Sequence, residues 1–492
     1  MNALPATEET EVLVVGSGFS GLIMALSLKR RRIPFLVLEK ADGVGGTWRD
    51  NTYPGCACDI PSHLYSISSE PNPNWQRTFA PQPEILRYLQ GVAAKRGLMP
   101  SVRFGAELTG AQWSESDNKW TVRTTDGRRF RGRVLVLAVG ALHIPLLPRI
   151  PGLDAFEGRT FHSARWDHGY DLAGKEVAVI GTGASAIQFV PQIADKVQHL
   201  TVFQRTPPWV LPKGDHAIPT ETQTRYGTIP GLRSLHRLRL FGLHEMRHMA
   251  MRRHPKAAAL GRSLADRHRK RAIKDEALRA ALTPRYEIGC KRILQSDDYY
   301  PALARDNVRL ETTPIARIAS DGVVTADGVL HRADAILFGT GFHVTDGFDA
   351  MDIRGRDNRS LRETWRGGMS AAYGTAVTGF PNMFVLLGPN TGLGHNSVVL
   401  MIEAQVRYVM RRLRQMRMRR LRSIEMSATV QERYQREMDR RLADTVWQAG
   451  GCSSWYQDES GRNTTLWPGT VFEYQRRMSR AGLRDYIIKE AV

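Results

Sequence analysis

Cysteine is scarce in this chain, and long apolar runs are missing from it. The 492 residues include four cysteines, Cys56, Cys58, Cys290 and Cys452, which form no CxxC pair and no regular frame. We therefore expect neither a disulfide scaffold nor a zinc or other metal site. No run of about 18 or more apolar residues is present, which argues against a membrane-spanning helix.

The amino terminus also lacks the features of a targeting sequence. Acidic rather than basic residues precede the first apolar run, and glycines interrupt that run, so it is not a signal peptide. These absences together predict a cytoplasmic protein.

Length and charge set the next limits. A chain of 492 residues is too long for one ordinary core, so we expect two or three domains, and its 42% hydrophobic content is enough to bury them. The formal net charge of +20 suits a nucleic-acid or membrane-surface partner. It suits equally an enzyme that attracts polyanionic cofactors. Charge alone therefore leaves these classes open.

The first strong pattern is an apolar run, a glycine-rich turn and a helical stretch. Residues 12–15 read as a buried strand, GSGFSG follows, a helix is expected over 21–31, and the next strand, 35–38, ends in Glu39. In this order the glycines admit a pyrophosphate, the helix amino terminus stabilises its charge, and the acid accepts hydrogen bonds from a ribose. The expected nucleotide contacts are Gly16, Gly18, Phe19, Ser20, Gly21, Glu39 and Lys40.

A glycine- and proline-rich segment follows this unit. It contains Gly46, Thr47, Trp48 and Tyr65, and it is either a surface loop or a functional loop, since loops just after a cofactor strand often carry function. Asp59 is the one carboxylate in the segment TYPGCACDIPSHLYS, which makes it a candidate to hold a cationic catalytic group. From the residues alone, a structural capping role for Asp59 remains an alternative.

The same pattern recurs in the middle of the chain. A buried strand at 177–180 leads into GTGASA and a helix over 185–193, and the next strand, 200–203, ends in Gln204 and Arg205. A neutral residue beside an arginine favours a ribose 2′-phosphate, so the second nucleotide should be NADP. The expected contacts are Gly181, Thr182, Gly183, Ala184, Ser185, Ala186, Arg205 and Thr206.

One site with an acid and one with an arginine predict a bound FAD that is reduced by NADPH. A disulfide reductase, a dehydrogenase and an oxygenase could all use this pair. Disulfide reductases need a redox dithiol, and Cys56 and Cys58 have CxC spacing, which disfavours that class.

A short segment between the two turns favours an oxygenase. FEGRTFHSARWD resembles the FxGxxxHxxxW(P/D) fingerprint of type I Baeyer–Villiger monooxygenases, with Phe156, Gly158, His162, Trp166 and Asp167 at the matching positions. Trp166 favours these ketone oxidisers over the flavin-containing monooxygenases that oxidise nitrogen or sulfur. The resemblance covers most of the chain outside its middle. The GGTW and YPG…CDIPS…YS segments look like the family's flavin region, which implies cofactor contacts at Gly46, Thr47, Trp48, Asp59 and Tyr65.

The resemblance implies the chemistry and several roles. It implies a ketone and O₂ as substrates, and an ester or lactone formed through a flavin C4a-peroxide. GCKRIL resembles the family's active-site segment, so Arg292 is expected to be the catalytic arginine, Lys291 a second contact to the NADP phosphate and Asp59 the acid that orients Arg292. For His162 we expect a structural or hinge role rather than proton transfer.

The predicted architecture is α/β, with two Rossmann-like dinucleotide-binding domains and a helical insertion. The FAD domain is expected at 1–145 and 381–492, the NADP domain at 146–208 and 288–380, and the insertion at 209–287. The basic insertion is expected to be a solvated helical face, with weak peripheral membrane contact as an alternative and no nucleic-acid partner. A monomer or a homodimer is expected.

Two other functions remain open at this point. One is a flavin-containing monooxygenase acting on nitrogen or sulfur. The other is a basic peripheral binding protein that uses a dinucleotide fold as a scaffold.

Overall fold

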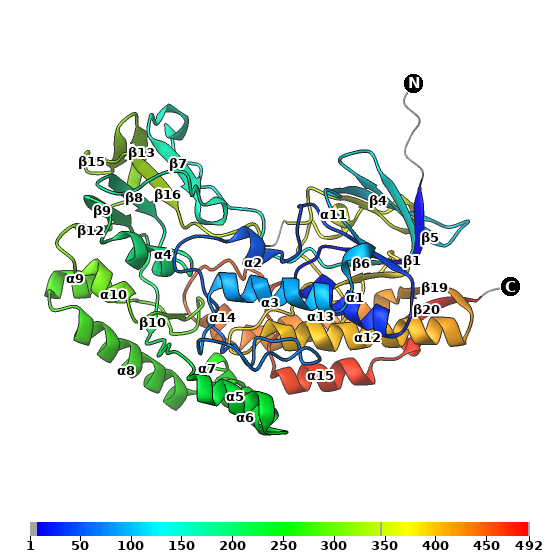
Figure 1. The fold of residues 1–492 in the computed structure, drawn as a ribbon. Coiled ribbons are helices and arrows are strands. Elements are labelled where there is room, and N and C mark those ends of the chain that lie inside the picture. Colours follow the sequence, from blue (N-terminus) through cyan, green and yellow to red (C-terminus); the bar gives the residue numbers. More distant parts are fainter. Residues whose placement is uncertain (1–6, 345–346, 491–492) are drawn as a thin grey trace.

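The computed structural model describes residues 7–344 and 347–490. It contains two sheet-based units side by side, with a row of helices beneath them (Figure 1). This arrangement confirms the predicted pair of Rossmann-like units and the predominantly helical insertion.

The first unit is built on β1 (Glu8–Val15), which lies between β2 (Phe35–Leu38) and β6 (Arg129–Leu137). All three pairings of this core are parallel, since β18 (Met383–Val385) also joins β6 in parallel. β3 (Val102–Arg103) extends the sheet beyond β2. Residues 12–15 of β1 are buried, as expected for a strand covered on both faces. The covering helices include α1 (Phe19–Arg30), α3 (Gln82–Lys95) and α12 (Val398–Met418).

The same sheet continues into an antiparallel part, which corrects one domain boundary. In the sheet, β5 (Lys119–Thr124) pairs with β6, β4 (Leu108–Ser114) pairs with β5, and β17 (Asp352–Arg354) pairs with β4. β17 and α11 (Leu361–Thr364) fall within the range 288–380, which was assigned to the second unit. Their apolar residues pack in the core of the first sheet, so the chain returns to the first unit before residue 381. The boundary was placed by motif position, which does not report sheet pairing.

The second unit is a five-stranded parallel sheet in the order β12, β9, β8, β16, β7. Its strands are β7 (Arg159–His162), β8 (Glu176–Ile180), β9 (His199–Phe203), β12 (Val308–Glu311) and β16 (Ala335–Phe338). Helices α4 (Ala186–Ile193) and α10 (Tyr299–Leu303) contact each other beside this sheet. A small antiparallel sheet of β13 (Ile315–Ala319), β14 (Gly322–Thr325) and β15 (Leu330–Arg332) adjoins it.

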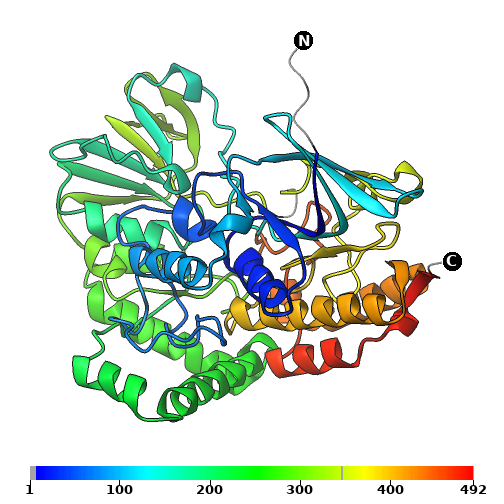
Figure 2. The ribbon, with the colours of Figure 1, turned by 45° about the vertical axis from the view of Figure 1, so that its right-hand side comes forward.

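The insertion is mostly helical and lies along the lower edge of the molecule (Figure 2). It contains α5 (Thr220–Thr228), α6 (Leu232–Met246), α7 (His248–Met251), α8 (Pro255–Ala272) and α9 (Glu276–Ala281). The short parallel pair of β10 (Val210–Leu211) and β11 (Leu294–Gln295) closes its base. Glu245 in α6 accepts hydrogen bonds from the backbone N–H groups of Val471 at 3.1 Å and Phe472 at 3.2 Å. These contacts join the insertion to the first unit.

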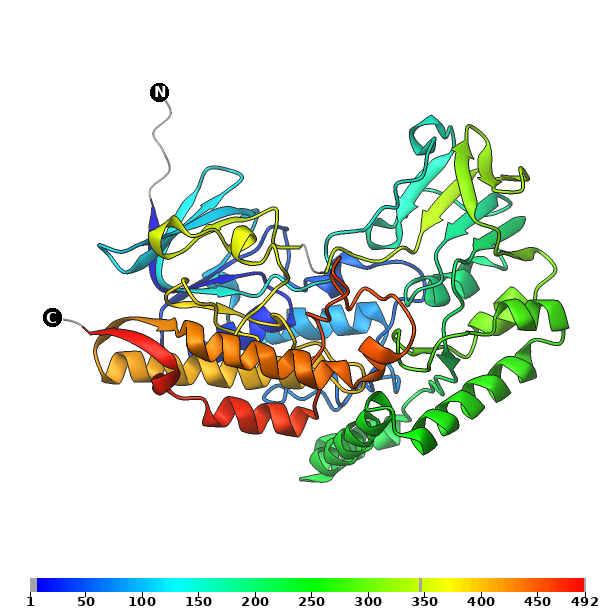
Figure 3. The same cartoon turned by 180° about the vertical axis from the view of Figure 1, so that it is seen from behind.

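The carboxyl-terminal region packs on the outer side of the first unit, where its long helices run beside one another (Figure 3). Its elements are α12, β19 (Leu421–Met426), α13 (Ala428–Ala443), α14 (Val446–Ala449), α15 (Val471–Arg480) and β20 (Tyr486–Glu490). Within the described ranges, no helix is long and apolar enough to cross a membrane.

One covalent feature departs from the sequence expectation. Cys290 and Cys452 form a disulfide across 162 positions of sequence, although no disulfide was expected. Spacing along the chain does not show which cysteines the fold brings together. Cys56 and Cys58 are free and buried.

Candidate functional site

The first glycine turn leaves no room for side chains. Gly16 has φ +102°, and a Cβ there would lie 2.6 Å from the carbonyl oxygen of Ala138. A Cβ on Gly21 would lie 1.9 Å from the carbonyl oxygen of Gly16. The start of α1 therefore sits directly on the end of β1, and Gly18 faces Gly46 with only backbone between them. This cradle fits a pyrophosphate at a helix amino terminus.

Glu39 directly follows β2 beside this cradle and is held as an anion. Its carboxylate accepts hydrogen bonds from Ser17 N at 2.9 Å, Ser17 Oγ at 2.6 Å and Ala41 N at 3.0 Å. Arg49 Nη1 donates to it at 3.0 Å. Burial opposes the charge, but these hydrogen bonds and the Arg49 charge outweigh burial and lower the pKa of Glu39. Glu39 is therefore ready to accept hydrogen bonds, and Arg49 is a residue that sequence reasoning missed.

Aromatic side chains from three segments meet near this turn. Trp48 Nε1 donates to the Tyr65 hydroxyl at 3.2 Å, and the Tyr65 ring packs edge-on against Phe19 at 4.9 Å between centroids. Phe19 and Ser20 begin α1 and are buried, whereas Lys40 is exposed. Gly46 precedes α2 (Thr47–Asp50) with φ +53°. The structure thus brings together the predicted contacts of the first unit, with Lys40 at its rim.

The second turn repeats this geometry and is open to solvent. Gly181 has φ +107°, and a Cβ there would lie 2.6 Å from the carbonyl oxygen of Gly339. Gly183 and Ala184 are exposed, and α4 begins at Ala186 with Ser185 before it. Thr182 Oγ1 donates to the carbonyl oxygen of Thr206 at 3.4 Å. Exposed N–H groups at this helix start can receive a second pyrophosphate.

Two cations gather beside the second turn. Arg205 is exposed at the end of β9, and neither Arg205 nor Lys291 forms an ion pair with any residue in the described ranges. Burial, and after it the charge of Arg205, lowers the pKa of Lys291, so these two side chains share one region. An anion placed between them would relieve their repulsion, which fits a ribose 2′-phosphate.

Gln204, the neutral residue before Arg205, is buried. Its side chain is 3% exposed, and its Nε2 donates to the carbonyl oxygen of Ala281 at 3.0 Å. Ala281 ends α9, so Gln204 ties the sheet to the insertion. Of Gln204 and Arg205, only Arg205 faces solvent.

Arg292 and Asp59 meet from distant parts of the chain. Arg292 Nε and Nη2 donate to Asp59 Oδ2 at 3.0 and 2.5 Å, and the two side chains are 29% and 28% exposed. The Asp59 charge raises the pKa of Arg292 above its ordinary value, despite burial. Burial disfavours the Asp59 charge, but Arg292 outweighs it and lowers the pKa of Asp59. Both groups therefore stay ionised.

The carboxyl-terminal region adds Tyr456 to this pair. Tyr456 is 1% exposed, burial raises its pKa to about 12, and its interactions with Arg292 and Asp59 place it beside them. Sequence reasoning did not single out Tyr456. The aromatic pair Trp455–Tyr456 in a turn-rich segment was the available signal.

The segment that carries Asp59 rests on the second unit. Gln188 in α4 accepts hydrogen bonds from the Tyr53 hydroxyl at 2.9 Å and from Ala57 N at 3.3 Å, and its Nε2 donates to the carbonyl oxygen of Ala57 at 3.0 Å. A Cβ on Gly55 would lie 2.6 Å from the carbonyl oxygen of Gln188. Asp59 is thus held where the two nucleotide units meet. Gln188 was not predicted.

The contacts of the fingerprint residues lie within the second unit. His162 ends β7, its Nδ1 accepts from Ala164 N at 3.1 Å, and burial lowers its pKa to about 4, so the ring is neutral near pH 7. A Cβ on Gly158 would lie 2.4 Å from the carbonyl oxygen of Asp334. The other fingerprint residues pack or form ion pairs. Phe156 packs against the core of the second sheet, and the ring centroids of Trp166 and Phe189 lie 5.3 Å apart. Asp167 forms an ion pair with Arg159 at 2.6 Å.

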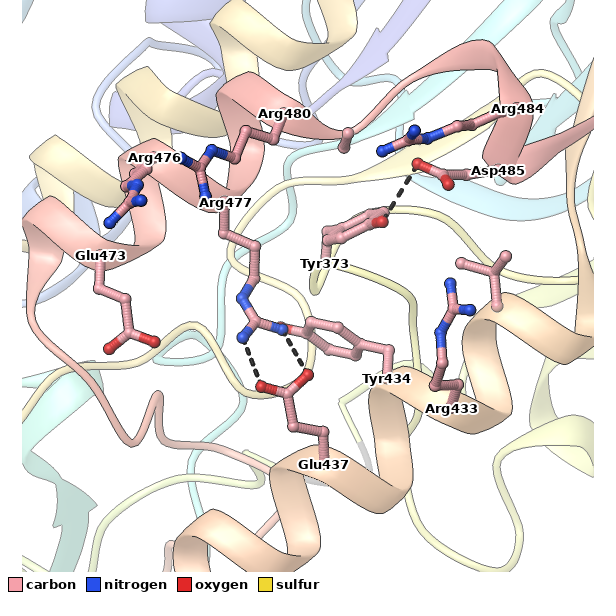
Figure 4. A pocket seen from close by; sticks show the side chains of 12 residues that line it. Tyr373, Arg433, Tyr434, Glu437, Glu473, Arg476, Arg477, Arg480, Arg484 and Asp485 are labelled. Carbon is pink, nitrogen blue, oxygen red and sulfur yellow. Dashed lines mark hydrogen bonds and ion pairs between the residues drawn. The ribbon is translucent and has the colours of Figure 1, made fainter.

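A separate pocket of about 430 Å³ lies between α13 and α15 (Figure 4). Glu437 pairs there with Arg477, and the Tyr373 hydroxyl donates to Asp485 at 3.1 Å. This pocket shares no residue with the two glycine turns or the Arg292–Asp59 pair. In the described part of the chain, no group of three or more His, Cys, Asp or Glu residues is arranged to hold a metal ion.

Known proteins match this chain along most of its length. A family model for an NAD(P)-binding Rossmann-like domain matches residues 14–81, and one for L-lysine 6-monooxygenase/L-ornithine 5-monooxygenase matches residues 73–210. A Baeyer–Villiger monooxygenase of Streptomyces coelicolor is 49% identical over 481 residues, which cover 97% of this chain and 92% of that protein.

Solved structures extend the match to the whole fold. An oxidised steroid monooxygenase bound to NADP superposes with a TM-score of 0.88 at 31% identity, covering 98% of this chain and 100% of that one. A cyclohexanone monooxygenase from Rhodococcus sp. Phi1 bound to NADP⁺ gives 0.89 at 30% identity, with 99% and 100% covered. The chain therefore belongs to the Baeyer–Villiger monooxygenases, and is an NADPH-dependent flavin enzyme that binds FAD and NADP(H).

Proposed function

We propose that this enzyme converts ketones to esters or lactones with O₂, that Arg292 is its catalytic arginine, and that Asp59 orients Arg292. The observation that carries the proposal is the Arg292–Asp59 pair at the junction of the two nucleotide units. A guanidinium stays protonated at all working pH values, so it can stabilise negative charge as it develops on oxygen.

The geometry of the pair supports this role. Two nitrogens of Arg292 bind a single oxygen of Asp59, so its third nitrogen, Nη1, is not engaged by that carboxylate. The planar guanidinium is fixed on one side and can present its other side to a substrate oxygen. Because Asp59 keeps the pKa of Arg292 above its ordinary value, the arginine does not lose its proton when an anion leaves.

The chain's other residues hold the cofactors and exclude water. Gly16, Gly18 and Gly21 would receive the FAD pyrophosphate and Glu39 its ribose, while Arg205 and Lys291 would bind the NADP 2′-phosphate. Bound FAD, once reduced by NADPH, supplies the activated oxygen, on the C4a-peroxide route that the sequence resemblance implies. Buried Tyr456 and the disulfide-linked segment beside it close one side of Arg292.

The test compares ester formed with NADPH consumed over a panel of cyclic, aryl, steroid and aliphatic ketones. Arg292→Ala should abolish ester formation and leave NADPH oxidation, because the positive charge is lost and the cofactor sites remain. Arg285→Ala is the matched control, since Arg285 is an exposed arginine in the same segment. Normal ester formation by the Arg292 variant, with full FAD content, would remove Arg292 from the mechanism.

Oxidation of nitrogen or sulfur is a second candidate, because residues 73–210 match a family model of amine-hydroxylating monooxygenases. The same assay with amines and thioethers decides between the two. Turnover of these compounds without any ketone product would favour the second candidate. A colourless protein that does not take up FAD would favour the basic binding protein instead. The cytoplasmic location and the monomeric or dimeric state remain predictions.

A further inference from the structure

The disulfide joins two segments that flank the proposed catalytic arginine. Cys290 lies two positions before Arg292, and Cys452 lies four positions before Tyr456. Arg292 and Tyr456 interact with each other. The cross-link and this contact therefore close a small ring, which runs through residues 290–292 and 452–456 and includes the Arg292 side chain.

The packing around the disulfide shows why this ring is tight. Glu287 N donates to the carbonyl oxygen of Gly450 at 3.1 Å, and a Cβ on Gly450 would lie 2.8 Å from Cys290 Cβ. Gly289 has φ +93° and faces Val446. The segment at 450–456 consequently follows the segment at 287–292 closely, with no side chain between their backbones at Gly450.

Cys290 and Cys452 differ in their exposure to solvent. Cys56 and Cys58 differ from this pair because they are free thiols. Cys290 is fully buried, whereas Cys452 is half-buried, so a small reagent can reach Cys452 first. Cys56 and Cys58 are buried thiols, and burial raises the pKa of Cys56 to about 12, which makes it unreactive. Among the four cysteines, reversible thiol oxidation is therefore confined to the pair beside Arg292.

We propose that Cys290 and Cys452 are a reversible redox site that clamps the segment 450–456 over Arg292. Oxidised, the clamp keeps water from the reacting centre and NADPH use is coupled to ester formation. Reduced, the segment opens and more of the NADPH consumed ends as hydrogen peroxide. This inference rests on the proposed function, because it assigns the clamp to the ketone-oxidising site.

The oxidant is hydrogen peroxide, and the reaction balances. The Cys452 thiol is oxidised by one peroxide to a sulfenic acid, and one water leaves. The Cys290 thiol then attacks the Cys452 sulfur, forming the S–S bond and releasing a second water. Two thiols thus lose two electrons and two protons to one peroxide, which yields two waters. Uncoupled turnover would in this way restore the coupled form of the enzyme.

The experiment uses the purified FAD-loaded enzyme, first without any mutation. Protein is reduced with dithiothreitol, desalted and reoxidised with hydrogen peroxide, and each form is alkylated and mapped by mass spectrometry. The ratio of ester to NADPH is then measured for each form. We expect the Cys290–Cys452 cross-linked peptide and a high ratio after oxidation, and a severalfold lower ratio after reduction.

Cys452→Ser supplies the matched comparison. It should resemble the reduced wild type in both states, while Cys56→Ser should keep the response of the wild type. Equal ratios for oxidised and reduced wild type would overturn the proposal, as would two free thiols at Cys290 and Cys452 after peroxide treatment.

A readout that does not need ketone oxidation separates failure of the clamp from failure of the proposed function. Trypsin can cut after Arg462, which lies six positions beyond the clamped segment 450–456. We expect cleavage there to become about tenfold faster or more on reduction. A cross-link that closes a long loop raises the free energy of opening by more than the amount that corresponds to a tenfold change in rate. If no form makes ester, the proposed function fails and this rate still tests the clamp. Cleavage unaffected by reduction would refute the clamp.

Discussion

Replacing Asp59 with asparagine tests the proposed site most directly. The substitution keeps the shape of the side chain and one acceptor oxygen, but it removes the charge that receives both Arg292 hydrogen bonds. Hydrogen bonds to a charged group contribute about 1.5–3 kcal/mol each, and the neutral amide oxygen keeps part of this. Losing about 1.4–2.8 kcal/mol of orientation corresponds to about 10- to 100-fold in the rate of ester formation.

Glu437→Gln is a close control for this change. Glu437 pairs with Arg477 in the separate pocket of Figure 4, and these side chains are 30% and 23% exposed, which resembles the 28% and 29% of Asp59 and Arg292. Both variants should lose similar thermal stability, whereas only Asp59→Asn should lose ester formation per FAD-loaded enzyme. NADPH oxidation should persist in both.

The assay is steady-state kinetics with product analysis, beside thermal unfolding of each variant. If Asp59→Asn makes ester about as fast as the wild type, Asp59 does not orient the catalytic group. If the two variants lose activity to the same extent, general destabilisation explains the loss and the assignment fails as well.

Three further predictions follow from other parts of the structure. Arg205→Ala should raise the KM for NADPH about 10- to 100-fold and leave that for NADH unchanged, since only the 2′-phosphate needs this cation, and an equal effect on both would contradict the NADP assignment. Gly21→Ala should prevent FAD uptake, measured as flavin absorbance per protein, because its Cβ would lie 1.9 Å from the Gly16 carbonyl oxygen; normal flavin content would show that the turn yields. Burial lowers the pKa of His63, His143, His162, His244 and His248 to about 4, so the unfolded chain binds more protons between about pH 6.5 and 4 and the free energy of unfolding should fall as pH falls through that window. Chemical denaturation of His162→Gln should show a weaker pH dependence there, and an unchanged slope would mean that His162 is protonated in the folded protein.

Local patterns predicted the secondary structure around both turns well. The strand expected at 35–38 is β2 (Phe35–Leu38), and the helix expected at 185–193 is α4 (Ala186–Ile193) with Ser185 before it. Such elements follow from apolar periodicity and from glycines that permit positive φ, and both are properties of neighbouring residues. The fingerprint residues, too, were found from their spacing, and the relatives confirm the family that they indicated.

Contacts between distant segments could not be predicted from the sequence. The pairing of β17 with β4 moves a domain boundary, Gln204 donates to Ala281 of the insertion, and Arg49 donates to Glu39. Each depends on which surfaces meet after the chain has folded. The local sequence around each of these residues does not predict which residue it contacts.

The sequence by itself determined two dinucleotide turns, the acid after the first and the arginine after the second, because these features are encoded within a few neighbouring residues. Only the tertiary structure decided what surrounds Arg292. Asp59, Tyr456 and the Cys290–Cys452 disulfide come from three segments far apart in the chain, and they meet because two sheets and the carboxyl-terminal region pack at one junction.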